Sequence, residues 1–189
     1  MNSYKHQYLI MNLEDKVFEE IQEKLLIHTN YQKSKTENFD GENFSPDEND
    51  PTRKSKVCFV DDEDIYNIIW ELADQVNCHS FWNFEIDKIE SLQHTLYEEG
   101  GFYDWHIDES QWTPFKRDEG RIRKISFTLL LNEDFDGGEF KILTDREMLI
   151  PMRKGDIIFF HSDMPHKVTK VRSGNRKSLV GWIQGPAFK

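Results

Sequence analysis

Apolar residues recur at helical spacing in two early stretches of the chain, 13–28 and 65–76. This repeat is typical of amphipathic helices that pack one face against a larger core. The apolar positions of the first stretch are Val17, Ile21, Leu25 and Ile27, and those of the second are Ile65, Ile68, Ile69, Leu72 and Val76. Asp61 and Asp62 precede the second stretch and can cap it. The pattern therefore predicts two helices that brace the outside of a sheet.

From Phe84 onward the pattern changes to short runs of β-branched and aromatic residues, separated by turn residues such as Asp136-Gly137-Gly138. Short runs bounded by Gly, Asp, Asn and Pro are typical of strands. The predicted strands are 84–92, 93–99, 104–108, 124–132, 138–143, 148–152, 156–162, 166–171 and 177–184. Because no long helices separate these strands, the pattern predicts a jelly roll or a barrel and argues against a parallel α/β sheet.

Residues 33–56 lie between the two predicted helices and are polar and acidic, with Ser-Pro and Asp-Pro breakers. This composition predicts a long mobile loop, and long loops in compact domains often act as lids. We expect a single domain over 1–189, in which 1–83 forms a helical support and 84–189 a β core. The chain has 189 residues, which is below the size at which one core divides into two.

Composition narrows the class of partner. The net charge of −11 argues against non-specific nucleic-acid binding, which requires clustered Lys and Arg. No apolar run approaches the length of a membrane span, and residues 1–16 lack the apolar core of a secretory signal. Cys58 and Cys78 offer no paired spacing for a zinc site or a disulfide scaffold. These features predict a cytoplasmic protein with neither a nucleic-acid nor a membrane partner, and they leave the oligomeric state open.

The sharpest local motif is His106-Ile107-Asp108. Residues two apart on a strand project from the same face, so an imidazole and a carboxylate at this spacing can reach one metal ion. Taken alone the motif is weak, because exposed strands often carry such a pair as hydrogen-bonded surface residues.

Two downstream histidines, His161 and His166, strengthen the metal interpretation. Two His and one carboxylate on one face, with open positions opposite, form the ligand set of non-haem Fe(II) oxygenases. His166 begins a predicted strand, whereas His161 ends the preceding one beside a turn. We therefore expect His166 to be the third ligand and His161 to support the site from behind it or from a lid.

Arg176 and Ser178 lie two residues apart on a further predicted strand. A guanidinium beside a hydroxyl can hold a carboxylate through charge-assisted hydrogen bonds. Singly, an Arg after a Ser-Gly-Asn turn is an ordinary exposed residue. In sequence order after His-x-Asp and a distal His, it suggests a site for a dicarboxylate.

Four blocks carry these residues in order: LYEEGGFYDWHID, KISFTLLLNEDFDGGEF, GDIIFFHSDMPHKVTKV and GNRKSLVGWIQ. Together they resemble the Fe(II)- and 2-oxoglutarate-dependent dioxygenases of the prolyl 4-hydroxylase type. They look most like the bacterial hydroxylases related to procollagen lysyl and prolyl hydroxylases. The resemblance covers about residues 92–184 and implies a mainly β fold, a double-stranded β-helix or jelly roll with N-terminal supporting α-helices.

By this resemblance, His106, Asp108 and His166 match the iron ligands, and Arg176 matches the residue that binds the far carboxylate of 2-oxoglutarate. Further residues are expected to line the cosubstrate pocket: Ser178, Tyr97, Tyr103, Ser126 and Thr128. One departure concerns Leu130, which stands where animal prolyl hydroxylases place a tyrosine that contacts the 2-oxoglutarate carboxylate.

The resemblance implies an enzyme that hydroxylates a C–H bond with Fe(II), 2-oxoglutarate and O₂, releases succinate and CO₂, and uses ascorbate (vitamin C) as reductant. The expected substrate is a prolyl or other peptidyl side chain. The lid-like loop and the segment 109–121, which includes Trp112, are expected to close over an extended peptide. Two alternatives stay open: the same chemistry on a free amino acid or small metabolite, and a cupin-like metal-binding protein without 2-oxoglutarate turnover.

Overall fold

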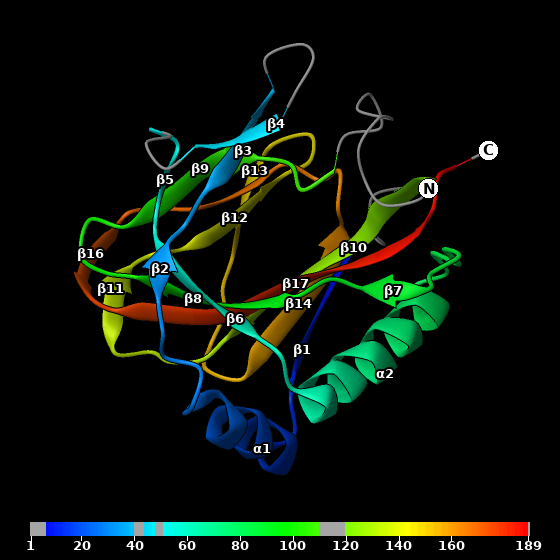
Figure 1. The fold of residues 1–189 in the computed structure, drawn as a ribbon, viewed down its shortest axis with the longest axis horizontal. Helices are drawn as coiled ribbons and strands as arrows, with labels where there is room; N and C mark the ends of the chain where they lie inside the picture. Colours follow the sequence, from blue (N-terminus) through cyan, green and yellow to red (C-terminus); the bar gives the residue numbers. More distant parts are fainter. Residues whose placement is uncertain (1–6, 40–43, 48–50, 110–119, 189) are drawn as a thin grey trace.

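The computed structural model describes residues 7–39, 44–47, 51–109 and 120–188. Two antiparallel sheets face each other, and two helices cover the outer side of the larger sheet (Figure 1). The mainly β fold predicted from the strand pattern is confirmed. None of the helices in these ranges is long and apolar enough to cross a bilayer.

The large sheet has the strand order β1-β14-β10-β17-β8-β6-β2, with β7 paired to β17 off this path. Its strands are β1 (Tyr8–Asn12), β2 (Gln32–Lys33), β6 (Lys56–Val60), β7 (Lys88–Ile89), β8 (Leu92–Tyr97), β10 (Arg121–Leu130), β14 (Asp156–His161) and β17 (Arg176–Pro186). The longest strands, β10 and β17, pair with each other at its centre.

The small sheet has the order β13-β12-β15-β9-β5. Its strands are β5 (Arg53–Lys54), β9 (Phe102–His106), β12 (Phe140–Leu143), β13 (Glu147–Ile150) and β15 (His166–Val168). Two further two-stranded sheets complete the described strands: β3 (Thr36–Phe39) with β4 (Phe44–Asp47), and β11 (Phe135–Gly137) with β16 (Val171–Gly174).

Both predicted helices are present: α1 over Asp15–Leu25 is shorter than the predicted stretch 13–28, and α2 over Glu63–His79 is longer than the predicted stretch 65–76. The Asp62 side chain caps α2 by accepting a hydrogen bond from the Ile65 backbone N–H at 3.0 Å. Both helices bury their apolar faces, including Ile21 and Ile69, against the outward face of the large sheet.

Alternation along β10 divides the protein into two layers. Ile125, Phe127 and Leu129 point toward the helices and join the first apolar cluster. The intervening residues Ser126 and Thr128 point into the space between the sheets, where a second apolar cluster lies. The outer face of the large sheet is covered by the helices, so a polar site between the sheets is built on the inner face.

The structure differs from the predicted division of the chain in two respects. Residues 33–56 contain β3, β4 and β5 and the first residue of β6, where the sequence predicts a loop. In addition, β1 and β6 belong to the large sheet although they precede residue 84. β3 and β4 pair with each other, whereas the other strands are held by partners far along the chain: β5 by β9, β6 by β8 and β1 by β14. Local polarity predicts loops poorly where the backbone is satisfied by such distant pairing.

Candidate metal centre and anion pocket

His106 and His166 are register partners on the neighbouring antiparallel strands β9 and β15. Asp108 follows two residues after His106, just beyond the end of β9. Its carboxylate lies between the two imidazoles, with Oδ1 3.7 Å from His106 Nε2 and Oδ2 3.5 Å from His166 Nε2. The three ligand atoms lie within 4.8 Å of one another, a spacing at which all can bind one ion.

Backbone carbonyls fix both imidazoles. His106 Nδ1 lies 2.8 Å from the Asp104 carbonyl, and His166 Nδ1 lies 2.9 Å from the Met164 carbonyl. Because a carbonyl only accepts, each Nδ1 carries the proton, which leaves each Nε2 lone pair free for a metal. The sequence pattern alone does not contain this tautomer information.

Aromatic rings hold the same imidazoles in place. Tyr103 stacks on His106 with ring centroids 3.4 Å apart. Phe160 meets His166 edge-on at 4.6 Å, and Phe140 lies 5.7 Å from it. Tyr103 thus lies against a metal-ligand candidate, and its place in the cosubstrate pocket stays a prediction.

The electrostatic environment keeps the candidate ligands in the forms that bind a metal. Burial, followed by the neighbouring His166, lowers the pKa of His106 to about 3. Burial opposes the charge on Asp108, but His166, His106 and Arg123 together outweigh it and lower the pKa of that carboxyl to about 2. At neutral pH, His106 is therefore neutral and Asp108 is ionised.

His161 lies on the other face of its strand. It packs edge-on against Trp82 and Phe84, at centroid distances of 4.8 and 4.9 Å, and burial lowers its pKa. Phe160, which precedes it on β14, points inward toward His166. The structure therefore brings His166 to His106 and Asp108 and holds His161 on the outer, helix-covered side.

Arg176 is the largest fully buried side chain among the described residues, with 2% of its surface exposed. Its Nη1 donates to Ser178 Oγ at 3.1 Å, and the Tyr97 ring lies 5.6 Å from its Cζ. Its Nε has no hydrogen-bond partner among the described residues. Burial lowers the pKa of Arg176, yet a guanidinium stays protonated at neutral pH. A buried cation with an unused donor is suited to binding an anion.

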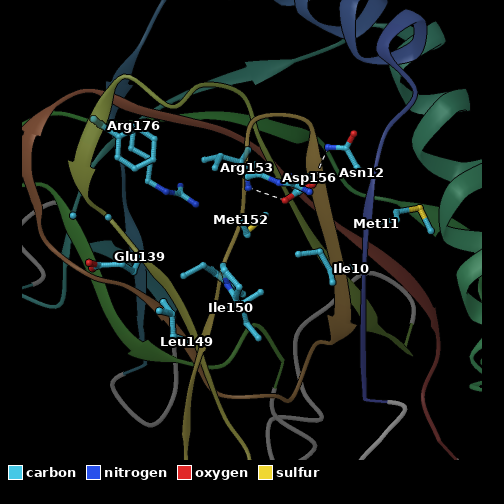
Figure 2. A pocket seen from close by; sticks show the side chains of 16 residues that line it. Ile10, Met11, Asn12, Glu139, Leu149, Ile150, Met152, Arg153, Asp156 and Arg176 are labelled. Atoms are coloured by element: carbon cyan, nitrogen blue, oxygen red, sulfur yellow. Dashed lines mark hydrogen bonds between the residues drawn. The ribbon is translucent and has the colours of Figure 1, made fainter.

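A cavity of about 640 Å³ lies beside Arg176, and Figure 2 shows the guanidinium pointing toward it. Leu130 and Phe140 form part of its wall, whereas the three candidate metal ligands are not among its lining residues. Leu130 thus presents an apolar surface where the resemblance implies a tyrosine in animal enzymes. We call Arg176 and its neighbours the anion group, and His106, Asp108 and His166 the metal group. The second apolar cluster, which contains Tyr97 and Phe160, connects the two groups.

The remaining predicted pocket residues divide between these two groups. Tyr97 and Ser178 accompany Arg176, since Tyr97 is its register partner on β8. Ser126 lies beside the metal ligands: its Oγ is 2.9 Å from Ser162 Oγ, and its hydrogen bond to Asp108 helps to lower the pKa of that carboxyl. Thr128 is buried on the same inward face of β10. Trp112 and most of the segment 109–121 lie outside the described residues.

Sequence reasoning missed Arg123, which donates to the Asp108 carbonyl, together with Glu90 and Glu109, which accept hydrogen bonds from Arg123. A β-bulge between Arg123 and Ile125 interrupts the alternation of β10, so that strict two-residue counting from Ser126 assigns Arg123 to the wrong face. Arg121, Arg123 and Lys124 stand close together in the sequence, and this basic run gives no other indication that Arg123 lies near the site.

The residues present fit an Fe(II) centre with 2-oxoglutarate. Two imidazole nitrogens and one carboxylate are the donor set of this iron chemistry. The unpartnered Nε of buried Arg176 supplies the cation that a dicarboxylate requires.

Comparison with known proteins agrees with this arrangement. Residues 92–184 match the family model of the 2OG-Fe(II) oxygenase superfamily. A PKHD-type hydroxylase of Idiomarina loihiensis is 35% identical over 91 residues, which cover 47% of this chain and 39% of that protein. One of Synechococcus sp. (strain CC9311) is 31% identical over 115 residues, covering 56% of this chain and 50% of that protein. The chain thus spans half or less of the length of these relatives.

Solved structures support the fold. A prolyl-4-hydroxylase of Pseudomonas putida superposes with a TM-score of 0.70 at 19% identity, covering 96% of this chain and 94% of that one. A prolyl hydroxylase of Trichoplax adhaerens superposes with a TM-score of 0.69 at 16% identity, covering 95% and 84%. The predicted double-stranded β-helix is confirmed.

Proposed function

We propose that this chain, whose residues 92–184 match the family model of the 2OG-Fe(II) oxygenase superfamily, is a 2-oxoglutarate-dependent hydroxylase whose iron is held by His106, Asp108 and His166. The observation that carries the proposal is the convergence of these three ligand atoms within 4.8 Å. The single domain over 1–189 is part of the same proposal, because β1 and β6 complete the large sheet of the catalytic core.

Each part of the site has a defined task in this proposal. Fe(II), together with 2-oxoglutarate and O₂, would supply the oxidising chemistry of hydroxylation, with succinate and CO₂ as the other products. The carbonyls of Asp104 and Met164 hold the Nε2 atoms of His106 and His166 ready. Arg176, with Ser178 against it, binds the carboxylate of 2-oxoglutarate that is distant from the metal. Phe140 and Phe160 exclude water from the His166 side.

The cosubstrate part of the proposal is tested by anaerobic addition of Fe(II) and then 2-oxoglutarate to the protein. We expect the weak visible charge-transfer band of a bidentate 2-oxoglutarate chelate, because the donor set leaves open positions on the metal. A cupin-like metal-binding protein without the Arg176 site would bind Fe(II) and give no such band. That result would replace the hydroxylase proposal with the cupin alternative.

For the substrate, we propose an extended peptide or protein segment with a prolyl or other side chain directed to the iron. The neighbour from Trichoplax adhaerens is described as a complex with a peptide fragment, which supports a peptide for this architecture. In this chain β5 pairs with β9, so that Arg53 lies over the Tyr103 ring, 4.6 Å from its centroid. β5 thus lies beside the Tyr103 ring that stacks on His106, and it is suited to flank a bound chain.

The substrate class is tested by incubating the enzyme with Fe(II), 2-oxoglutarate and ascorbate, together with proline-containing peptides, lysate proteins or a panel of free amino acids. Mass spectrometry should detect one added oxygen atom on a peptide or protein. Efficient oxidation of a free amino acid, with none of any peptide, would instead establish the small-metabolite alternative and leave the iron chemistry intact.

A further inference from the structure

Asp108 lies beyond the last residue of β9, so the backbone hydrogen bonds of the small sheet do not fix its position. On one side, the backbone N–H groups of Asp108 and Glu109 both donate to the Ser162 carbonyl at 2.9 Å. On the other side, Arg123 Nη1 donates to the Asp108 carbonyl at 3.2 Å. Whatever fixes Arg123 therefore also fixes the backbone that carries the carboxylate.

Arg123 is itself held from three directions. Its guanidinium makes a two-point ion pair with Glu90, through Nε to Oε1 at 2.6 Å and Nη2 to Oε2 at 2.5 Å. The plane lies over the Trp182 ring, 3.9 Å from its centroid. The Arg123 backbone N–H donates to Glu109 Oε2 at 2.9 Å. One residue thus grips Asp108 with its side chain and Glu109 with its main chain.

Glu90 is anchored as well, because Gln184 Nε2 donates to its Oε1 at 2.6 Å. The Arg123 and Glu90 side chains are 17% and 19% exposed, so solvent screens this pair less than a surface pair. A guanidinium can bridge two acceptors in fixed directions, whereas an ammonium acts as a point charge. The two contacts together require a guanidinium, because Glu90 and the Asp108 carbonyl are bound by different nitrogens of Arg123.

We infer that Arg123 is a positioning residue that holds Asp108 in place for the metal, and that Glu90 aligns Arg123 for this task. The inference rests on the proposed function, because it concerns the same iron site. Groups that orient metal ligands typically change metal affinity by roughly 10- to 100-fold when they are removed.

The test measures Co(II) affinity of the apo-protein by anaerobic calorimetry and by the visible bands of bound Co(II), with thermal unfolding measured in parallel. In Arg123→Met we expect affinity about tenfold or more below wild type. Arg123→Lys should recover part of the loss, because it keeps the charge without the fork. Asp87→Asn is the matched control. Asp87 precedes Glu90 by three residues, and its Oδ1 lies 3.1 Å from Nε of Arg121, which is on β10 like Arg123. Its Co(II) affinity should equal that of wild type.

Arg123→Met leaves Glu90 without its cation and can destabilise the fold, so the double variant Arg123→Met/Glu90→Gln removes both charges together. We expect it to fold, to bind Co(II) weakly, and to regain turnover at high Fe(II) with an unchanged KM for 2-oxoglutarate. If the double variant binds Co(II) as tightly as wild type, the positioning role is overturned. If wild type itself does not bind Co(II), the proposed function fails instead.

Discussion

Asp108→Ala and His166→Ala should each abolish succinate formation while the protein stays folded. Each substitution removes one of three ligands whose atoms lie within 4.8 Å, and two remaining ligands hold a divalent metal poorly. Succinate release from 2-oxoglutarate is the direct measurement, with Co(II) titration of the same samples to show that the metal is lost. Circular dichroism of each variant checks that the loss is not unfolding.

His161→Ala serves as the control for the choice of histidine. His161 packs between Trp82 and Phe84 on the helix-covered side, so its removal should lower the melting temperature and preserve succinate formation. An inactive, folded His161→Ala protein together with an active His166→Ala protein would show that the distal ligand is misassigned.

Arg176→Ala should raise the KM for 2-oxoglutarate by about one to two orders of magnitude. Losing a charge-assisted hydrogen bond costs about 1.5 to 3 kcal/mol, and every 1.4 kcal/mol is roughly tenfold in affinity. The expected size follows from the burial of Arg176, its contact with Ser178 and its unused Nε donor. Initial rates against 2-oxoglutarate concentration at saturating Fe(II) provide the measurement.

Lys177→Ala is the matched comparison, because Lys177 is the neighbouring cation on β17 and points to solvent on the opposite face. Its KM for 2-oxoglutarate should stay within about twofold of wild type, as expected for an exposed charge. Equal increases in both variants would mean that a diffuse basic surface, in place of one positioned guanidinium, binds the cosubstrate.

The sequence was informative where function depends on short spacing along one strand. His106 and Asp108, or Arg176 and Ser178, share a face because strand alternation is local and regular. The choice of His166 over His161 rested on their positions, at the start of one predicted strand and at the end of another beside a turn, and the structure brings His166 to the other two residues. The cylinder of two sheets likewise follows from many short strands without intervening helices.

Other features depend on pairing between distant residues, to which a local pattern is insensitive. β1 and β5 are short strands that exist because β14 and β9 supply their hydrogen-bond partners. Arg123 was missed because the bulge beside Lys124 shifts the strand by one residue. The stacking of Tyr103 on His106 also required coordinates, because strand alternation does not predict ring contacts.

The pairing of β1 with β14 also affects the tendency of the protein to aggregate. β1 forms one edge of the large sheet, and its partner strand β14 contains Ile157, Ile158, Phe159 and Phe160 in succession. Without β1, this apolar strand would become the edge and present its unpaired backbone to other molecules, a recognised route to aggregation. Residues 8–12 therefore act as a protective cover for the strand that packs against His166, and a chain trimmed of them should self-associate before it loses its metal ligands.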